Sequence, residues 1–430
     1  MAHKLVEDSS ASEFLQGLQE EHLSELAFLL AQRQRYLHNP EVEWPDIESL
    51  EIRIIRHAEA TRVGGEAALV HARGALASEA WDELAAGAYT RVFIGPESEG
   101  IAEALARMAE LDTELLPYCV EALMLVQHPR LSEKLGALLT SSRPEVRAAS
   151  LRIIGHRCDS EAGLLLPLLD DAVVEVRAAA ALAVADLGHR PALPVVERKL
   201  AQAPLDELDV WALAALRLGS SRALHACRQS CYTADSIPPR LPWLLGLAGE
   251  AQDLGLLSQL CGRSELSAVS LEALGMLGVP TAMPLLLDHL EHGIPAVKHA
   301  AAKALSLITG MGFTEKSELP VAEFRDGDEV EFQQVVRPST DAAKWRAWWN
   351  AHRARLEGTS RLRLGQPYSL SLCLEELAHP RTPFDARERA ALEFVIHSGQ
   401  AVGFQPDWPV RRQRQTIEHW RRGLTQRNWK

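Results

Sequence analysis

The chain has 430 residues, of which 47% are hydrophobic and only 6% are aromatic. This composition suits helices rich in leucine and alanine better than a β-sandwich. The formal net charge of −13 excludes an overall electrostatic footprint for nucleic acid and fits a basic binding partner. No stretch approaches the roughly 20 consecutive apolar residues of a membrane span.

The first hundred residues predict helices without visible repetition. Ser10 and Glu13 have capping-box spacing, and leucines follow them at helical intervals. Glu7 and Asp8 stand where an export signal needs an apolar run, so we expect a cytoplasmic location. We interpret residues 1–100 as an N-terminal helical cap, because the terminal units of repeat proteins are atypical.

Residues 101–310 carry an internal repeat. The phrase Glu-Val-Arg-Ala-Ala occurs twice, with Arg147 and Arg177 thirty positions apart. Further units end in glycines at intervals of 31, 30 and 29 residues, namely Gly188, Gly219, Gly249 and Gly278. This period indicates a series of about six helical hairpins, which stack because one hairpin alone cannot bury its apolar face.

The hairpins resemble HEAT and armadillo-like repeats, and this resemblance implies an all-α fold, an α-solenoid. In that family an Asp that ends the first helix and an Arg that begins the second form a polar ladder between units. Asp170 and Asp171 with Arg177 match this pattern. Arg147 matches it as well, but serines occupy the positions of its Asp, so we expect an incomplete ladder there. We interpret both arginines as structural.

After the repeats the pattern changes twice. Residues 311–340 are rich in acids and predict an exposed acidic loop, and residues 341–430 predict a small, mostly helical C-terminal region. In the latter region an aromatic stripe falls on one helix face, formed by Trp345, Trp348, Trp349 and His352. Packing of this stripe against the last repeat is the preferred interpretation, and a partner contact is the alternative.

The C-terminal end is basic. The last twenty residues carry a formal charge of +6, which leaves −19 for residues 1–410. Two hypotheses are open for this end, contact with nucleic acid and folding back onto the acidic body. We prefer folding back, because the charge of the body would repel phosphate.

The sequence contains few patterns that are typical of a catalytic or metal-binding site. Six cysteines lack the spacing of a disulfide framework and are expected to be reduced, namely Cys119, Cys158, Cys227, Cys231, Cys261 and Cys373. His225 with Cys227 and Cys231 comes nearest to a metal site, but the histidine does not share the helix face of the two cysteines. A phosphate-binding glycine loop and a nucleophile elbow are both missing from the sequence. We therefore expect no catalytic residues, no metal and no cofactor.

Over nearly its full length the chain resembles an uncharacterised proteobacterial family of HEAT-like repeat proteins associated with type VI secretion loci. The most specific parts of the likeness are Ile308-Thr309-Gly310 and the helix with Trp348-Trp349. Arg361-Leu362-Arg363-Leu364-Gly365 and the segment 387–394 extend it. Members are often encoded beside secretion-spike and effector genes, and no catalytic motif is established for the family. The basic end of this chain is a departure from the pattern.

The resemblance implies an immunity protein that binds and neutralises a cognate type VI toxin. A cytoplasmic nuclease is the preferred toxin, because nucleases hold DNA on basic surfaces that an acidic protein complements. The predicted partner-binding residues are Glu315, Glu318, Asp326, Asp328, Glu329 and Glu331. Direct contact with nucleic acid or a membrane is not expected.

Two other functions are open. The first alternative is an adaptor or chaperone that loads an effector onto the secretion spike. The second is a repeat enzyme similar to the phycobilin lyases or the alkyl-base DNA glycosylases, which the acidic balance disfavours.

Overall fold

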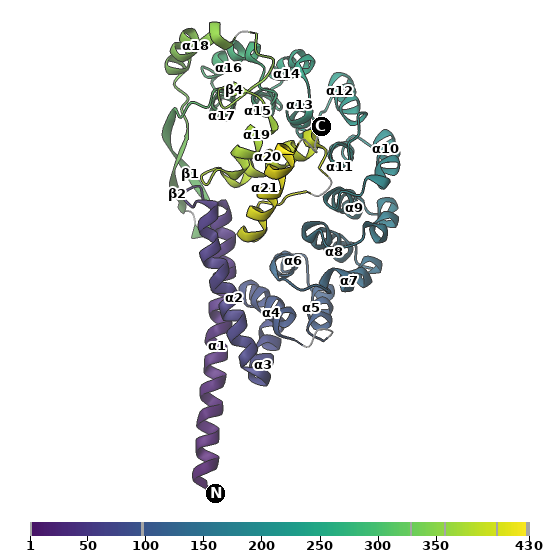
Figure 1. The fold of residues 1–430 in the computed structure, drawn as a ribbon, viewed down its shortest axis with the longest axis vertical. Coiled ribbons are helices and arrows are strands. Elements are labelled where there is room, and N and C mark those ends of the chain that lie inside the picture. The colour runs from purple at the N-terminus through teal and green to yellow at the C-terminus, as the bar shows by residue number, and fades with distance from the viewer. Residues whose placement is uncertain (1, 96–98, 327–328, 357, 401–402, 427–430) are drawn as a thin grey trace. The chain divides into compact units, whose positions relative to one another are not determined.

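A computed structural model describes residues 2–95, 99–326, 329–356, 358–400 and 403–426 (Figure 1). The fold is an all-α arrangement of helical repeats, as the sequence predicted, with two small antiparallel strand pairs among the described residues. Internal contacts divide the chain into two units. Unit 1 comprises Met1–Ala192, Leu377–Ala391 and Gln400–Gly423, and unit 2 comprises Leu193–Glu376, Leu392–Gly399 and Leu424–Lys430. The domain boundaries expected from the sequence stay predictions.

Unit 1 opens with three helices and a 3₁₀ turn, namely α1 (Ala2–His38), η1 (Trp44–Asp46), α2 (Ile47–Val63) and α3 (Gly65–Ala77). It continues with α4 (Trp81–Ile94), α5 (Glu99–Glu110), α6 (Leu116–Leu125), α7 (Leu131–Leu135), η2 (Gly136–Thr140), α8 (Pro144–Arg157), η3 (Ala162–Asp170), α9 (Val174–Asp186) and η4 (Arg190–Ala192). The second helices of successive hairpins, α4, α6, α8 and α9, pack against one another in that order (Figure 1). Nearly all of α21 (Val410–Thr425) also belongs to this unit.

Unit 2 repeats the same plan with α10 (Leu193–Gln202), α11 (Leu208–Arg217), α12 (Ala223–Thr233), α13 (Arg240–Ala248), η5 (Ala251–Asp253), α14 (Leu254–Leu260), α15 (Ser267–Leu277), η6 (Pro280–Ala282), α16 (Met283–His289) and α17 (Pro295–Thr309). Its second helices are α11, α13, α15 and α17, again in contact in that order. It then holds β1 (Thr314–Asp326), β2 (Glu329–Pro338), α18 (Ala342–Leu356), β3 (Leu362–Arg363), β4 (Gln366–Pro367) and most of α19 (Leu370–Ala378). The helix α20 (Phe384–Ser398) begins in unit 1 and ends in unit 2.

Small residues allow the second helices to approach closely. A Cβ atom placed on Gly275 of α15 would lie 2.6 Å from the Cα atom of Ala304 on α17. In unit 1, a Cβ atom on Gly155 of α8 would lie 2.8 Å from the Cα atom of Ala183 on α9. Real Cβ atoms do not come this close to backbone, so glycine is needed at both positions.

The expectation of an incomplete polar ladder at Arg147 is wrong. The Arg147 guanidinium binds both carboxylate oxygens of Asp171, at 2.9 and 2.8 Å, and Asp171 belongs to the following hairpin. Arg177 donates to the backbone oxygen of the same Asp171 at 2.8 Å. The serines that stood in place of an Asp were therefore no defect, because the carboxylate comes from the next unit. Arg228 and Asp253 form the same bidentate pair in unit 2, at 2.6 and 2.8 Å.

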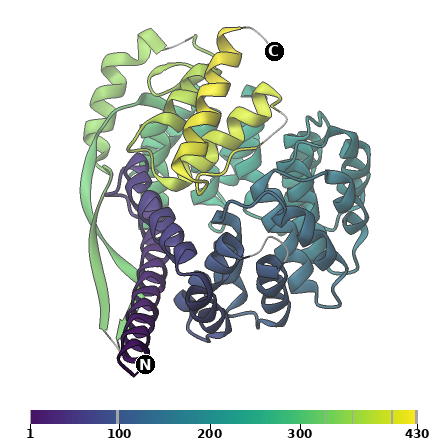
Figure 2. The same ribbon diagram turned by 60° about the horizontal axis from the view of Figure 1, so that its bottom comes forward.

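The expected acidic loop at residues 311–340 is wrong, because most of this segment forms an antiparallel ribbon. β1 pairs with β2 from Thr314 opposite Pro338 to Asp326 opposite Glu329, with an irregularity between Pro320 and Arg325. Figure 2 shows this twisted ribbon running away from α18. The high density of acids concealed the strand signal of the interspersed valines and phenylalanines, and charged residues are a common protection of exposed strand edges.

The tryptophan stripe divides between core and surface. Trp345 is fully buried, donates from Nε1 to the Ser339 oxygen at 2.7 Å, and meets the Phe313 ring at a centroid distance of 4.9 Å. Trp348 and Trp349 are half-buried. The packing interpretation is thus confirmed for Trp345, which lies on the helix that contacts α16.

Two of the motifs that carry the family resemblance meet in unit 2. Gly310 ends α17 with a φ angle of +68°, and its Cα lies so close to Leu364 that a Cβ would clash with that backbone. The amides of Leu364 and Gly365 donate to the carbonyl oxygens of Leu307 and Ile308, at 2.8 and 2.9 Å. The Ile-Thr-Gly and Arg-Leu-Arg-Leu-Gly motifs are therefore two halves of one structural joint.

A buried ionic cluster reinforces that joint. Arg363 is fully buried and donates to Glu376 at 2.9 Å and to both oxygens of Glu393 at 2.8 and 2.6 Å. Glu393 is also buried and binds Arg361 as well. Charges removed from water in this way are tolerated only when they are paired.

The basic C-terminal end folds back within unit 1. Arg414 pairs with Glu48 of α2, and the Arg412 guanidinium donates to the Arg157 oxygen at the end of α8, at 2.7 Å. Trp408 is buried and donates from Nε1 to the His156 oxygen, also at 2.7 Å. These contacts confirm the preference for folding back. Within the described part of the chain, no helix combines the length and hydrophobicity that crossing a membrane requires.

The close helix approach yields a stability prediction. We expect Gly275→Ala to lower the free energy of unfolding by about 1–3 kcal/mol, because overpacking pushes α15 from α17. Gly255→Ala on α14 is the matched control, since a Cβ there meets nothing within 4 Å. It should be neutral or slightly stabilising, because alanine favours helix. Urea denaturation compares the two, and equal effects would contradict the close-contact account.

The buried ionic cluster yields a second stability prediction. Glu393→Ala should lower the free energy of unfolding by about 3–5 kcal/mol, because it leaves the Arg363 guanidinium buried with one of its two carboxylates missing. The control is Glu375→Ala, which removes an exposed glutamate of α19. Thermal unfolding followed by circular dichroism measures both variants. A loss below about 1 kcal/mol in Glu393→Ala would show that the cluster does little for stability.

Candidate functional site

A groove of about 520 Å³ crosses α6 and α8 in unit 1. Its apolar floor includes Val120 and Met124 of α6 and Ala148 of α8. The segment before α21 adds Asp407, and Glu175 at the start of α9 lies at the far end. A volume of this size falls within the range of protein binding sites.

The charged side chains of the groove are mostly acidic. Glu121, Glu145, Glu175 and Asp407 line it, and Arg152 is the one basic side chain among its described lining residues. Glu145 is paired with Arg143 at 2.7 Å, while Glu121 and Glu175 are exposed to solvent. The groove therefore presents a negative surface over an apolar floor.

Asp407 is held in a fixed position by two elements. His156 of α8 lies with Nε2 3.0 Å from a carboxylate oxygen of Asp407, and Arg33 of α1 donates to the Asp407 backbone oxygen at 2.6 Å. Burial alone would raise the pKa of Asp407, but the charge and hydrogen bond of His156 and the charge of Arg33 lower it. The Asp407 carboxylate is thus ionised and oriented in the groove wall.

Glu121 behaves in the opposite way. Although the residue as a whole is exposed, the protein on one side partly desolvates its carboxylate and raises the pKa, and the nearby negative charge of Asp407 raises it further. Arg33 opposes this shift only in part, since its guanidinium is committed to Glu51 at 2.9 Å. A carboxylate kept ionised at a cost is a common feature of binding and catalytic sites.

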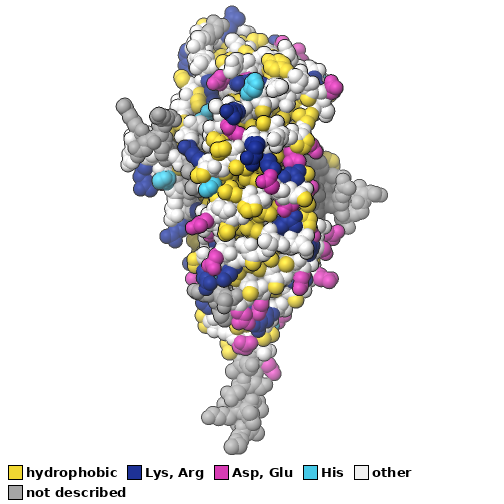
Figure 3. Space-filling model, turned by 90° about the vertical axis from the view of Figure 1, so that its right-hand side faces the viewer, with side chains coloured by type: hydrophobic (Ala, Val, Ile, Leu, Met, Phe, Trp, Pro, Cys, Tyr) yellow, Lys and Arg dark blue, Asp and Glu magenta, His cyan; other side chains and the backbone are white. Residues whose placement is uncertain are grey.

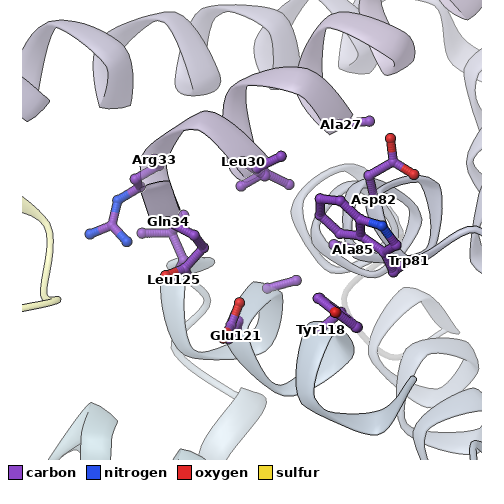
Figure 4. Close-up of a pocket in the computed structure, with 12 residues that line it drawn as sticks. Ala27, Leu30, Arg33, Gln34, Trp81, Asp82, Ala85, Tyr118, Glu121 and Leu125 are labelled. Atoms are coloured by element: carbon purple, nitrogen blue, oxygen red, sulfur yellow. The ribbon is translucent and has the colours of Figure 1, made fainter. Parts of the chain in front are cut away.

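Aromatic side chains adjoin Glu121 in a small neighbouring pocket between α1, α4 and α6. Figure 4 shows Trp81 of α4 on the side of the pocket opposite Tyr118 and Glu121 of α6, with the Asp82 carboxylate directed toward Ala27 and the Arg33 guanidinium pointing away. The Trp81 and Tyr118 rings have centroids 5.0 Å apart, and Trp81 is 38% exposed. Exposed tryptophan and tyrosine beside acids can receive cationic side chains.

The partner-binding residues expected from the sequence lie on the β1–β2 ribbon. Glu315 accepts hydrogen bonds from the Thr340 amide at 3.0 Å and the Thr340 hydroxyl at 2.9 Å, so its carboxylate holds the base of the ribbon. Glu318 is exposed. Asp326, Glu329 and Glu331 lie in the strands, but their side chains are outside the described residues, as is all of Asp328. The binding role of this set stays a prediction.

The cysteines and histidine singled out in the sequence lie on α12. Cys227 and Cys231 are buried, and burial raises the pKa of each thiol to about 12, so both stay protonated at neutral pH. His225 is exposed on a different face. Among the described residues, no group of three or more histidine, cysteine or acidic side chains has metal-binding geometry.

Sequence reasoning missed the acidic groove. The repeat period indicated helical hairpins over residues 101–310, where α6 and α8 lie, but Asp407 comes from a segment far along the chain that has no repeat signal. Figure 3 shows acidic and basic side chains interspersed on the face that it draws, so the net charge alone did not locate the site. The one local signal was Trp81 beside Asp82, an exposed aromatic next to an acid at the start of a helix.

Comparisons with known proteins add no family. No protein-family model and no curated protein matches the chain. Among solved structures, an engineered protein is similar at 15% identity with a TM-score of 0.31, over 86% of this chain and 98% of that one. Human deoxyhypusine hydroxylase in complex with glycerol is similar at 17% identity with a TM-score of 0.24, over 67% of this chain and 96% of that one. Scores this low carry no argument about function.

The raised pKa of Glu121 predicts a pH-dependent effect. Because the folded protein disfavours the ionised form, Glu121 lowers stability once the pH exceeds its usual pKa of 4.5. We therefore expect Glu121→Gln to raise the melting temperature at pH 7 and to have little effect below pH 4. Melting curves from pH 3.5 to 8 measure this, with Glu114→Gln, an exposed acid before α6, as control. A destabilised Glu121→Gln protein at pH 7 would contradict the assignment.

Proposed function

We propose that this protein is an interaction protein whose acidic groove in unit 1 binds a basic segment of a partner protein. The observation that carries the proposal is the joint presence of Glu121, Glu175 and Asp407 around one groove, beside the Trp81–Tyr118 pair. The acids supply charge complementarity, and the aromatic pair supplies contact area. Binding rather than catalysis is the role that such a surface fits.

The interaction can be described residue by residue. A lysine or arginine side chain of the partner approaches the face of the Trp81 ring and pairs with Glu121. Further basic side chains along the partner segment pair with Asp407 and Glu175. Surface attraction of this kind speeds association and depends on salt, whereas the partly buried tryptophan determines how long the complex lasts.

For the identity of the partner we rely on the family resemblance. We propose a cognate type VI toxin, with a cytoplasmic nuclease preferred, which the protein neutralises as an immunity protein inside the cell. A nuclease surface that binds DNA phosphates is basic, and an acidic groove can occupy it. The net charge of −13 supports this choice of partner.

An adaptor that loads an effector onto the secretion spike is the second candidate. The β1–β2 ribbon favours it, because a two-stranded ribbon offers unpaired strand edges for strand addition by another protein. Phe332 and Val336 on β2 are 59% and 66% exposed. A chain with two binding surfaces can hold two proteins at once, as an adaptor must.

The test is co-purification with the product of the adjacent gene, followed by a toxicity-rescue assay. An immunity protein should bind the toxin and restore growth, whereas an adaptor should bind it and leave toxicity unchanged. We expect the affinity to fall at least tenfold between 50 and 500 mM salt, since exposed ion pairs are screened. Trp81→Ala and the double variant Glu121→Gln/Glu175→Gln should each weaken binding by about tenfold or more.

The control variant decides between the two surfaces. Glu318→Gln removes an exposed acid of the ribbon and should leave the affinity within about twofold, as expected for a rim charge. If Glu318→Gln weakens binding as much as the groove variants do, the ribbon and not the groove is the contact. Absence of any complex with the neighbouring gene product would remove the toxin from the proposal.

A further inference from the structure

A second cavity in unit 1 has a different chemical character. It encloses about 460 Å³ between the end of α1, the η1 turn and the start of α20. Its walls are largely apolar and aromatic, with contributions from Tyr36, Val42, Trp44 and Phe384. The volume corresponds to that of a small organic ligand.

A buried cation forms part of this cavity. Arg387 is 1% exposed, and its guanidinium lies 4.0 Å from the centroid of the Trp44 ring. Nε donates to the Leu377 oxygen at 3.1 Å, and Nη2 donates to Oε1 of Gln413 at 2.6 Å. No hydrogen bond joins Nη1 to a described residue, and Nη1 is not among the fully buried polar atoms that lack a partner. This donor group is therefore accessible to solvent or to a ligand.

Within the described ranges, no carboxylate pairs with this charge. The comparably buried Arg33, Arg91 and Arg363 each contact a glutamate, at 2.9, 2.5 and 2.6 Å. Arg387 has only neutral acceptors, and burial lowers its pKa to about 9 with no opposing contribution from any acid. Arg387 is still charged at neutral pH. A buried cation without a counter-charge lowers the stability of the fold unless an anionic ligand pairs with it.

The other charged groups around the cavity are engaged elsewhere. Arg381 is mostly exposed and pairs with Glu43 at 2.7 Å. Asp385 and Glu388 are exposed at the rim, and each takes part in a further interaction. His38 packs against the Phe384 ring at a centroid distance of 4.4 Å. Arg387 is thus the group that can attract a ligand into the cavity.

We propose that this cavity binds a small carboxylic acid with an aromatic body. The ligand carboxylate accepts a hydrogen bond from Nη1 of Arg387, and its ring lies between Tyr36, Phe384 and the apolar wall. Arginine suits this task, because its planar guanidinium can stack on Trp44 while its edge still donates to a carboxylate. This site does not depend on the groove or on the partner proposed for it.

The first test uses the unmodified full chain and needs no variant. Isothermal titration compares 3-phenylpropionate with its neutral analogue 3-phenylpropanamide at pH 7. We expect the acid to bind at least about tenfold more tightly, because a charged hydrogen bond is lost with the amide. Equal affinity of the two compounds, or no binding of the acid at 10 mM, would overturn the proposal.

Proton uptake on binding distinguishes a ligand contact from a structural role, because it is expected only if Arg387 contacts the ligand. A bound carboxylate should return the pKa of Arg387 toward its usual value. At pH 9 binding should therefore take up protons, and the measured enthalpy should change with the ionisation enthalpy of the buffer. An enthalpy independent of the buffer at pH 9 would contradict the role of Arg387.

Three variants complete the experiment. Val42→Trp fills the cavity and leaves Arg387 unchanged. It should lower the affinity for 3-phenylpropionate at least tenfold. Arg387→Gln removes the charge and should lose the preference for the acid over the amide. The matched control Arg381→Gln removes the exposed rim charge and should change the affinity less than threefold, because an exposed charge is screened. A larger loss in Arg381→Gln than in Val42→Trp would place the ligand at the rim and sink the proposal.

Discussion

The carbonyl groups that end the second helices organise both units. The last carbonyls of a helix have no intrahelical partner and must find donors elsewhere. In unit 1, Trp408 and Arg412 donate to the end of α8, and Gly403 donates to Asp186 of α9 at 3.2 Å. In unit 2, the β3–β4 segment and the helix α20 supply the donors for α13, α15 and α17. The C-terminal part of the chain is therefore a component of the repeat fold, because it satisfies polar groups that the repeats leave open.

Buried charges specify where this C-terminal part attaches. Arg363 with Glu393 in unit 2 and Arg33 with Glu51 in unit 1 are paired inside the protein, and Glu51 also accepts from the Val410 amide at 2.8 Å. Removing one member of such a pair would leave the other charge buried alone, at a cost of about 3–5 kcal/mol. Arg387 departs from this rule, since its acceptors are neutral. A departure from charge pairing inside an otherwise well-paired protein is most simply understood as a place kept for a ligand.

The acidic groove also holds charges whose arrangement lowers the stability of the folded protein, though to a smaller extent. Folding desolvates Glu121 and places it near Asp407, and both effects raise the pKa of Glu121, whereas His156 and Arg33 keep Asp407 ionised. Two carboxylates that repel each other reduce stability, and a cation from outside relieves the repulsion. The basic C-terminal helix does not fill this role, because its Arg412 and Arg414 are used at the end of α8 and on α2. The negative charge of the groove is thus available to a partner.

The sequence by itself determined the all-α repeat class and the hairpin period, because periodicity, small residues and glycine ends are local properties of the chain. For Trp345 it favoured packing but left a partner contact open. Composition also determined the sign of the net charge. Only the tertiary structure decided that Arg147 pairs with the following hairpin, that the acid-rich segment is a ribbon, and that Asp407 joins Glu121 in one groove. It alone decided that Arg387 lies buried beside a cavity. The physical reason is that a pattern along the chain reports which face of a helix is covered, whereas the segment that covers it is chosen by long-range packing and by the pairing of buried polar groups.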